Sequence, residues 1–559
     1  MVIALTYRQA GHPALSKFAA RCLELLQMGM DANLRLFAGA FLELYGSMCG
    51  RLDVSLMTYR IIRPLLDHPD VTSLAKCMSL GISSWTCVHT ENFEEGRQII
   101  ARLETFGHEE NLHLGRRFAC ILGAYLDFRR ADLKAAQERI RRFEQILIPS
   151  APYEAASIVG MKCYMALFAG HPEQAAAMGS ELMRLYDRTG SLCHRLFMYA
   201  VVIWANAALD RFKEAESVIR EYRKIEPGRH MEWMSWGPLV SEAWMAMQRQ
   251  QTQQLEDFLR KIFEQSRPRN LGYGFAMIWS KAWMPELCER ALEAGIEIDN
   301  VRDYIREYRV EAPGQHMEAW PWQIRIRCLG QFDILAADRQ VDYGTKPPRK
   351  LLALLKAIIA LGSRDVPEQK LADALWSEED GDTAHQSFTA ALHRLRKLLG
   401  DKTLIRQRDN RISLDTSRVW VDVLAFEALC AREAEADHAT TKHVIDLYRG
   451  EFLVHDDAPW AFSMREKLRA RYLGLVSAAA RRFEQEGRHE EALDLYRRGI
   501  EADELAETFH QGLMRCHHQV GRTPEALDAY RRMRELLDRV HGIQPSPATE
   551  ELYWKLFNC

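Results

Sequence analysis

Gly487-Arg-His-Glu-Glu-Ala-Leu-Asp-Leu-Tyr-Arg-Arg498 is closely repeated by Gly521-Arg-Thr-Pro-Glu-Ala-Leu-Asp-Ala-Tyr-Arg-Arg532. The two stretches begin 34 residues apart, which is the period of the helix pairs called tetratricopeptide repeats. A single helix pair cannot bury its apolar face alone, so such pairs stack on their neighbours. The repeat therefore predicts that residues 419–559 form a domain of stacked helices.

A longer repeat runs through the first 310 residues. Short polar turns begin at positions 50, 91, 131, 170, 210 and 250, at intervals of 39 to 41 residues. After the turn at 210, helical spacing puts Phe212, Ala215, Val218, Ile219 and Tyr222 on one face. The pattern predicts an α-solenoid of tetratricopeptide-like helix pairs over residues 1–310.

The composition is that of an ordinary globular chain. Among 559 residues, 47% are hydrophobic and 27% charged, and 74 basic against 77 acidic side chains give a net charge of −3. This balance excludes a uniformly basic nucleic-acid coat protein but allows a local basic patch. The start does not resemble a signal peptide, and no apolar run is long enough to cross a membrane. We therefore expect a cytoplasmic protein with no membrane partner.

The sequence shows no pattern typical of a metal site, a cofactor site or a catalytic site. The twelve cysteines are scattered singly, which is typical of neither a metal ribbon nor a disulfide framework. His108 and His113 lack the i, i+4 interval of a two-histidine zinc helix. We found no GxSxG elbow and no glycine-rich dinucleotide loop. We expect no metal, no cofactor and no enzymatic activity.

The helical period ends at residues 311–322, which we interpret as a linker, and a different pattern occupies residues 323–418. Ile324 and Ile326 alternate with Arg325 and Arg327, as in a half-buried strand. Two more short strands are predicted at 331–335 and 340–343, followed by three helices and a hairpin that turns at Asp409-Asn410. This order of elements is that of a winged helix.

The three helices are predicted from their apolar spacing and caps. The first follows Pro347-Pro348 and buries residues at 351, 354, 355 and 358. The second is expected to be capped by Asp365 and to bury Leu371, Ala374 and Leu375. The third is expected from about Thr383 to Leu399.

The third helix is the expected reader of base edges in the major groove. Its apolar stripe consists of Phe388, Ala391, Leu392, Leu395 and Leu399. The outward face, free of carboxylates over this span, consists of Thr383, Gln386, Ser387, Ala390, His393, Arg394 and Lys397. Three alternatives stay open: Gln386 could complete a capping box with Thr383, His393 could be an ordinary surface histidine, and Arg396 could pair with a carboxylate of the preceding helix.

The hairpin is expected to hold the DNA backbone. If Arg408 pairs with Arg411 across the turn, Arg406, Arg408 and Arg411 share one face, and Ile405, Ile412 and Leu414 share the other. From 383 to 411, seven basic side chains against two acidic ones give a local charge of +5. Lys346, Arg349 and Lys350 are expected to contact phosphates as well.

Residues 323–559 resemble the SARP-type regulators, in which an OmpR-type winged helix precedes a bacterial transcriptional activator domain. The matching strings are Leu329-Gly330, Pro348-Arg-Lys-Leu-Leu-Ala-Leu-Leu355, Leu371-Ala-Asp-Ala-Leu-Trp376, Leu392-His-Arg-Leu-Arg-Lys-Leu-Leu-Gly400, Leu447-Tyr-Arg-Gly-Glu-Phe-Leu453, Gly521-Arg-Thr-Pro-Glu-Ala-Leu527, Gly542-Ile-Gln-Pro-Ser-Pro547 and Leu552-Tyr553. One departure is Asp503-Glu504, where the family usually has proline after the aspartate. The resemblance implies binding to direct repeats in promoters, with dimerisation or RNA polymerase contact through the C-terminal helices.

The first 310 residues resemble the helical-repeat region of maltose-regulator-type proteins, which often carry a nucleotide-switch domain upstream. No GxxxxGK[ST] string is present here, so the chain either lacks such a switch or starts downstream of a lost one. A cluster of aromatic residues has two interpretations, packing between solenoid layers or a pocket for an effector. Its tryptophans are Trp233, Trp236, Trp244, Trp279 and Trp283.

Together these patterns predict a mainly α protein in three parts: an N-terminal α-solenoid, a small α/β winged-helix domain and a C-terminal tetratricopeptide-like domain. The predicted function is a sequence-specific DNA-binding transcriptional regulator that acts as an activator and a homodimer on DNA. Its helical repeats are expected to bind a small-molecule or protein effector. The alternative is a scaffold or adaptor protein in which the winged helix contacts other proteins.

Overall fold

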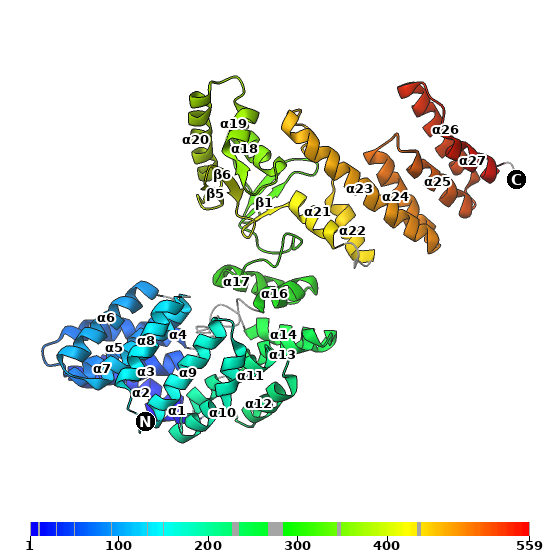
Figure 1. The fold of residues 1–559 in the computed structure, drawn as a ribbon. Helices are drawn as coiled ribbons and strands as arrows, with labels where there is room; N and C mark the ends of the chain where they lie inside the picture. Colours follow the sequence, from blue (N-terminus) through cyan, green and yellow to red (C-terminus); the bar gives the residue numbers. More distant parts are fainter. Residues whose placement is uncertain are drawn as a thin grey trace. The chain divides into compact units, whose positions relative to one another are not determined.

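The computed structural model describes residues 2–8, 12–28, 31–49, 51–90, 92–130, 132–148, 150–225, 234–265, 283–343, 348–432 and 438–557. The chain divides into two compact units, Met1–Glu311 and Ala312–Cys559. Both units are built mainly of helices (Figure 1), so the mainly α fold class is confirmed.

The first unit contains only helices within its described residues. They are α1 (Val2–Arg8), α2 (Leu15–Gln27), α3 (Ala32–Met48), α4 (Leu52–Ile62), η1 (Arg63–Asp67), α5 (Ser73–His89), α6 (Phe93–Glu109), α7 (His113–Arg129), α8 (Leu133–Ile146), α9 (Pro152–Phe168), α10 (Pro172–Thr189), α11 (Leu192–Ala207), α12 (Phe212–Lys224), α13 (Trp236–Gln248), α14 (Thr252–Gln265), α16 (Met284–Glu293) and α17 (Ile298–Tyr308).

The periodic turns of the first unit share one hydrogen-bond pattern. The backbone N–H of His171 donates to the carbonyl of Ala166, that of Arg211 to Asn206, and that of Gln251 to Ala246, at 2.8, 3.0 and 2.9 Å. In each turn the preceding residue has positive φ, namely 81° at Gly170, 55° at Asp210 and 57° at Gln250. This is the Schellman ending of a helix, which reverses the chain within a few residues. The predicted turns at 170, 210 and 250 are therefore confirmed.

The same ending recurs in the second unit. The backbone N–H of Arg488 donates to the carbonyl of Phe483, and that of Arg522 to His517, after glycines with φ of 76° and 75°. The preceding glycines, Gly487 and Gly521, are the residues that open the two 34-residue repeats. A left-handed residue is needed once per helix pair, which explains why these glycines recur at a fixed period.

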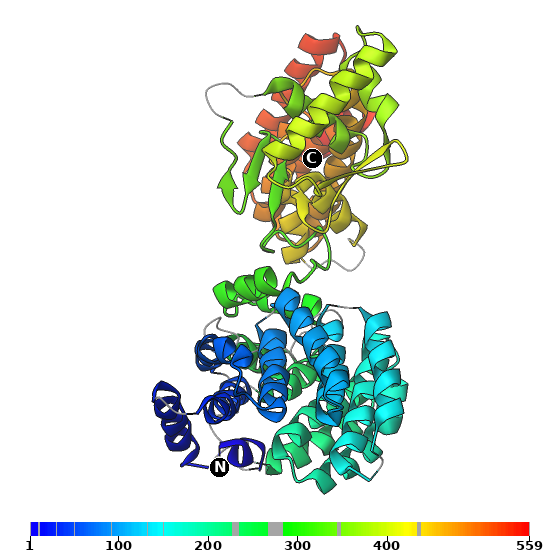
Figure 2. The same ribbon diagram turned by 90° about the vertical axis from the view of Figure 1, so that its left-hand side faces the viewer.

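The row of helix pairs in the first unit bends back on itself. Helix α1 packs beside α11, as both views show (Figures 1 and 2). The sulfur of Cys193 on α11 lies 3.3 Å from the sulfur of Met48 on α3, although 145 residues separate them. The first helices of successive pairs therefore meet around a common interior.

The second unit combines strands and helices. The strands are β1 (Ile324–Arg327), β2 (Asp333–Ala336), β3 (Arg339–Gln340), β4 (Val366–Pro367), β5 (Ile405–Arg408), β6 (Arg411–Leu414) and β7 (Val419–Val421). The helices are α18 (Arg349–Ala360), α19 (Glu368–Leu375), α20 (Gly381–Leu398), α21 (Asp422–Ala431), α22 (His438–Leu447), α23 (Pro459–Gln485), α24 (His489–Ala502), α25 (Glu507–Gln519), α26 (Thr523–His541) and α27 (Pro547–Phe557).

Two small sheets frame the first three of these helices. One has the order β3-β2-β1-β7, with β1 antiparallel to β2 and parallel to β7, and the other has the order β4-β6-β5. The prediction that the chain is helical from Val419 onward is wrong for Val419–Val421. These three residues are buried in a strand that, among the described residues, pairs only with β1, almost 100 residues earlier.

Residues 312–322, which belong to the stretch interpreted as a linker, are held against the strands of the second unit. Trp320 and Trp322 are buried. The Gln315 side-chain amide donates to the carbonyls of Thr416 and Val419, both at 2.8 Å, and its oxygen accepts from the N–H of Val421 at 2.9 Å. The segment is irregular but fixed to β7, because an amide side chain satisfies the open edge of that strand.

A close backbone contact joins the winged-helix region to the helical repeats of the same unit. A Cβ on Gly330 would lie 3.1 Å from the carbonyl oxygen of Arg449, and a Cβ on Gly450 would lie 3.1 Å from the Cα of Gly330. Both glycines have positive φ, 92° and 152°. Larger side chains would separate the two segments, so these positions require glycine.

Polar contacts hold the same junction. The buried carboxylate of Asp422 accepts hydrogen bonds from the backbone N–H groups of Cys328 and Leu329, at 2.7 and 2.8 Å. The Lys356 ammonium lies 2.7 Å from Asp456. The strings around 329–330 and 447–453 therefore meet in one junction.

The described tryptophans of the aromatic cluster pack against their neighbours. Trp244 stacks on Trp283 with ring centroids 4.8 Å apart, and Trp283 meets Trp204 edge to face at 5.8 Å. Trp236 is 2% exposed and lies beside Tyr304. This arrangement favours packing between layers over an effector pocket at these side chains. Trp233 and Trp279 lie outside the described residues.

Candidate nucleic-acid interface

Helix α20 begins earlier than the sequence predicted. Its cap is Asp380, whose carboxylate accepts a hydrogen bond from the backbone N–H of Thr383 at 2.9 Å. Thr383 is therefore the third helical residue, and the capping box with Gln386 is wrong. The cap uses an extended residue with a short acceptor just before the glycine that opens the helix. Gln386 remains available on the surface.

The two predicted faces of α20 are confirmed. Phe388, Ala391, Leu392 and Leu395 are buried, together with Ala384 and with Leu399 just beyond the helix. The buried face packs on α18 and α19, and Phe388 meets Trp376 edge to face at 6.3 Å. The exposed residues of the predicted outward face are Thr383, Gln386, Ala390, His393, Arg394 and Lys397.

The remaining positions refine this face. Ser387 is half-buried and its hydroxyl donates to Glu379 at 2.7 Å. Because the helix starts at Gly381, the exposed Asp382 enters its first turn, so the outward face is not free of carboxylates. A carboxylate at a helix N-terminus is favourable because it faces the positive end of the macrodipole.

Arg396 links α20 to the hairpin. Its guanidinium donates two hydrogen bonds, at 3.0 and 2.9 Å, to the carbonyl oxygen of Ile405 on β5. The alternative of a carboxylate partner on the preceding helix is wrong, because the strand carbonyl lies within reach on the other side. By contrast, the side chains of Arg394 and Lys397 have no ion pair or hydrogen-bond partner among the described residues.

The hairpin has the predicted register. Arg408 pairs with Arg411, and Ile405 with Leu414, in the antiparallel ladder of β5 and β6. Ile405, Ile412 and Leu414 are buried, whereas Arg406, Arg408 and Arg411 are exposed. The alternation of a strand puts the three arginines on one face.

The three hairpin arginines differ in their partners. The guanidinium of Arg406 lies 2.6 Å from Asp415, and Arg411 donates to the carbonyl of Asp365 at 2.8 Å. Arg408 is 92% exposed, and among the described residues it pairs only with the neighbouring Asp409, which is 84% exposed, at 3.3 Å. Exposed pairs contribute little, so Arg408 is the hairpin arginine most available to a ligand.

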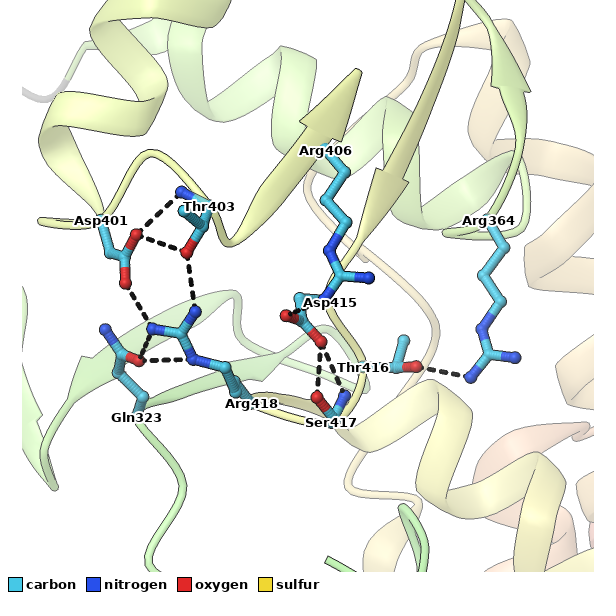
Figure 3. Close-up of polar contacts among 9 residues, drawn as sticks. All are labelled: Gln323, Arg364, Asp401, Thr403, Arg406, Asp415, Thr416, Ser417 and Arg418. Carbon is cyan, nitrogen blue, oxygen red and sulfur yellow. Dashed lines mark hydrogen bonds and ion pairs between the residues drawn. The ribbon is translucent and has the colours of Figure 1, made fainter. Parts of the chain in front are cut away.

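A polar network fixes the base of the hairpin (Figure 3). Arg418 donates to Thr403 at 2.7 Å, bonds to Gln323 and pairs with Asp401. Hydrogen bonds from Thr403, followed by those from Arg418, hold the pKa of Asp401 well below its usual range. Arg418, just before β7, is thereby bonded to Asp401 and Thr403 in the loop before β5 and to Gln323 just before β1.

Asp415 is the second acceptor of this network (Figure 3). It takes hydrogen bonds from the hydroxyl of Ser417 and from Arg406, both at 2.6 Å. Burial raises the pKa of Asp415, but these hydrogen bonds outweigh burial and the net pKa is lowered. The carboxylate therefore stays ionised and holds Arg406 in place.

The three residues predicted to contact phosphates near the start of α18 differ in their surroundings. Arg349 is exposed at the first residue of α18. The Lys350 ammonium donates to the carbonyl of Leu375 at 2.5 Å and lies 5.3 Å from the ring centroid of Trp376, so it caps α19. Lys346 lies outside the described residues.

Helix α19 also differs from its prediction. Asp365 has φ of 51°, which is unsuited to a cap, and Val366–Pro367 form β4 beside β6 before the helix begins at Glu368. The helix buries Leu371 and Ala372, whereas Ala374 and Leu375 are half-buried. Pairing with a distant strand moved the helix start and with it the buried face.

Two further cations lie beside these elements and were absent from the predicted site. Lys402 is exposed in the turn after α20 and has no side-chain partner among the described residues. Arg364 is exposed and donates to the Thr416 hydroxyl at 2.5 Å (Figure 3). The sequence signal for Lys402 was its place in the basic run from 394 to 411; no local pattern points to Arg364.

Comparison with known proteins finds a domain model and two relatives that this chain resembles. The model of the bacterial transcriptional activator domain matches residues 421–556. The regulatory protein AfsR of Streptomyces griseus is 27% identical over 262 residues, which cover 45% of this chain and 26% of that protein. The chain is therefore similar to the SARP-type regulators, and residues 421–556 match the activator domain. AfsR of Streptomyces coelicolor (strain ATCC BAA-471 / A3(2) / M145) is 30% identical over 215 residues, which cover 37% of this chain and 22% of that protein.

The matches confirm the SARP-type resemblance and support a transcriptional regulator. They span only about a quarter of the length of the AfsR proteins. Among solved structures, EmbR of Mycobacterium tuberculosis with a low-affinity phosphopeptide covers 42% of this chain and 65% of its own, at 21% identity and a TM-score of 0.35. The SARP-type assignment rests on the sequence matches. None of the helices in the described ranges could span a membrane.

Proposed function

We propose that the chain is a sequence-specific DNA-binding transcriptional regulator that activates its promoters. The observation that carries the proposal is the outward face of α20. It presents Arg394 and Lys397 without side-chain partners among the described residues, in the same unit as the activator domain. Helix α20 would enter the major groove, where arginine, lysine and glutamine can bond to guanine and adenine edges.

In this proposal the helix α20 reads bases and the hairpin contacts the DNA backbone. Gln386, His393, Arg394 and Lys397 would read bases, because they are exposed along one side of a helix whose other side is packed. Arg408 and Lys402 would contact phosphates, because each is exposed and neither is held by a buried acceptor. Arg349 would add a phosphate contact at the start of α18.

The partnered cations have a different role in the proposal. Arg396, Arg406 and Arg411 bond to groups of their own chain, so they orient the hairpin relative to α20. Arg406 and Arg411 remain exposed and could still approach a phosphate, but each would share its charge with an existing acceptor. We expect their loss to weaken binding through geometry as well as charge.

The activator domain, residues 421–556, would contact RNA polymerase or a second copy of the chain. The proposal includes binding to promoter direct repeats as a homodimer, which the SARP-type resemblance supports. The helical repeats of the first unit would bind an effector that changes the population of the DNA-binding state.

The test is selection of random duplexes by the purified full chain, followed by salt titration of the selected duplex. We expect a repeated motif and a log–log salt slope of about −0.9 per neutralised phosphate. An adaptor whose winged helix contacts proteins would enrich no motif and show no duplex affinity. That result would overturn the proposal in favour of the adaptor.

A further inference from the structure

The interior of the first unit contains a cavity formed by helices from five successive pairs. Its wall includes residues of α3, α5, α7, α9 and α11, which are the first helices of their pairs, and one residue of α10. The contact between Met48 and Cys193 closes the ring of helices, because it joins α3 to α11. A ligand there would touch helices that span some 150 residues of sequence.

The wall of the cavity is apolar and uncharged. Among the described residues of the wall, none is aspartate, glutamate, lysine or arginine. Aromatic side chains dominate: Trp85 and Tyr125 meet edge to face with centroids 5.5 Å apart, and Phe118 lies on the same wall. Such a wall favours a neutral ring, because a charged ligand would lose its hydration, and the nearby Arg117 guanidinium lies over the Phe118 and Tyr153 rings and pairs with Glu154.

Several polar groups interrupt the apolar wall: the hydroxyl-bearing side chains of Tyr125, Ser157 and Tyr186, and the pair formed by Tyr153 and His194. Tyr153 and His194 both line the cavity, and the Tyr153 hydroxyl lies 2.9 Å from Nε2 of His194. On the other side of the ring, Nδ1 of His194 lies 2.7 Å from the hydroxyl of Ser191. Burial lowers the pKa of His194 to about 4, so the imidazole is neutral at neutral pH.

In either tautomer the bond to the neutral imidazole takes one function of the Tyr153 hydroxyl, and the Ser157 hydroxyl, which also hydrogen-bonds to this side chain, is the group with which a ligand would compete for the other. If Nδ1 carries the proton, Tyr153 donates to Nε2 and its oxygen can still accept. If Nε2 carries the proton, it donates to Tyr153, and the tyrosine O–H can donate elsewhere. A ligand hydroxyl can both donate and accept, so it complements both states.

We infer that this cavity is a binding site for a small neutral ring compound bearing a hydroxyl group. The inference rests on the proposed function, in which the first unit binds an effector, and it names the site and the ligand chemistry. Trp85, Tyr125 and Phe118 would enclose the ring, and Tyr153 would bond to its hydroxyl.

The size of the cavity limits the ligand to one ring. Its volume is about 80 Å³. An apolar cavity of about 150 Å³ binds benzene, so the wall has to yield for a ring to enter. Met48 and Met198 both line the cavity, and unbranched methionine side chains adapt readily to a new neighbour.

The experiment is methyl NMR of the full chain labelled at its methionine methyl groups, titrated with phenol, toluene or benzoate. Met48→Leu and Met198→Leu assign the two cavity signals. We expect phenol to shift both signals saturably and toluene to bind about fivefold more weakly, for want of one hydrogen bond. Benzoate should cause no shift. The exposed Met28 and Met57 serve as internal references.

Tyr153→Phe should abolish the preference for phenol over toluene. The matched control is Tyr222→Phe, a buried tyrosine on α12 whose hydroxyl has no partner among the described residues and which does not line the cavity. The inference fails if phenol leaves the Met48 and Met198 signals unmoved, if it shifts Met28 and Met57 equally, or if Tyr153→Phe retains the preference.

This readout needs no DNA, so it separates the two proposals. If no duplex is selected but phenol binds as described, the DNA-binding proposal fails and the cavity site stands. If a duplex is selected but phenol does not bind, the cavity site fails and DNA binding stands.

Discussion

Helix α20 and the hairpin of β5 and β6 are both basic, but they use their charges differently. On α20, Arg394 and Lys397 project from a packed helix without side-chain partners among the described residues. In the hairpin, Arg406 and Arg411 bond to Asp415 and to the carbonyl of Asp365. The difference teaches that a basic residue offers its full charge to DNA where its own chain holds it least, and shares that charge where a fixed acceptor lies within reach.

The largest expected effect tests the unpartnered side. The double variant Arg394→Ala with Lys397→Ala should lower affinity for the selected duplex by about 100-fold, since each good base contact contributes about 1–3 kcal/mol. Affinity for unrelated duplexes should fall far less. Binding isotherms on both duplexes measure this.

Lys213→Ala is the matched control, because it removes one exposed charge from α12 of the first unit. It should leave both affinities unchanged. If the double variant weakens binding to all duplexes alike, α20 does not read the bases. The proposed difference in role between α20 and the hairpin is then wrong.

The next effect tests the partnered side. Arg418→Ala removes the bonds to Gln323, Thr403 and Asp401 at the hairpin base (Figure 3). We expect the free energy of unfolding of the second unit to fall by about 1–2 kcal/mol. Hydrogen bonds to charged groups are among the stronger ones, but the Arg418 side chain is partly exposed to solvent, which weakens its bonds. Urea unfolding followed by circular dichroism gives the value.

Arg408→Ala is the control for that measurement, since Arg408 is 92% exposed and should change unfolding by less than about 0.5 kcal/mol. Equal losses in the two variants would show that the network at the hairpin base does not stabilise the unit.

A smaller effect separates arginines within the hairpin. Arg408→Ala should reduce the salt slope of duplex binding by about one unit, because one phosphate contact is lost. Arg406→Ala should weaken binding with a smaller change in slope, since Asp415 already offsets the Arg406 charge. Salt titrations of both variants decide the matter; an identical change in slope would mean that the internal ion pair does not restrain Arg406.

The smallest expected effect is a gradual change of stability with pH, which should differ between a carboxyl group that has an arginine partner and one that has none. Burial raises the pKa of Asp422, which accepts only backbone N–H groups, to about 6. The folded state then holds the proton more tightly than the unfolded state, whose pKa is about 4. Stability from this group is therefore complete below about pH 4 and is lost as the pH rises through about 6.

Asp415 has the opposite sign. Its lowered pKa means that its contribution is present above about pH 4 and is lost as the pH falls through the folded pKa. Urea unfolding of the second unit between pH 4 and pH 8 should show a decline of stability with rising pH that Asp422→Asn removes and Asp415→Asn preserves. In the first unit, Glu43, whose pKa burial raises to about 8, adds a decline of the same sign. A decline that persists in Asp422→Asn would assign it to another group.

The sequence carried enough information for the parts of the interface that depend on local pattern. Helical spacing separates Phe388 and Leu395 from Arg394 and Lys397, and the two-residue turn aligns Arg408 with Arg411. Both follow from backbone geometry, which repeats every 3.6 or every two residues regardless of the rest of the chain. The turn glycines Gly487 and Gly521 were predictable for the same reason.

The partners of the cations were not predictable, because they lie far along the chain. Lys350 bonds to a carbonyl 25 residues later, and Arg364 to a hydroxyl 52 residues later. Strand β4 displaced the expected cap of α19 by pairing with β6. A local sequence pattern cannot predict an acceptor that comes within 3 Å of the cation only after the chain has folded.

The sequence by itself therefore determined the periods, the helix faces and the hairpin register, since each follows from the geometry of one element. Only the tertiary structure decided which cations stay unpartnered, how residues 312–322 pack on β7, and that five helices surround a cavity. These features depend on contacts between segments tens to more than a hundred residues apart, and such contacts form only when the elements pack.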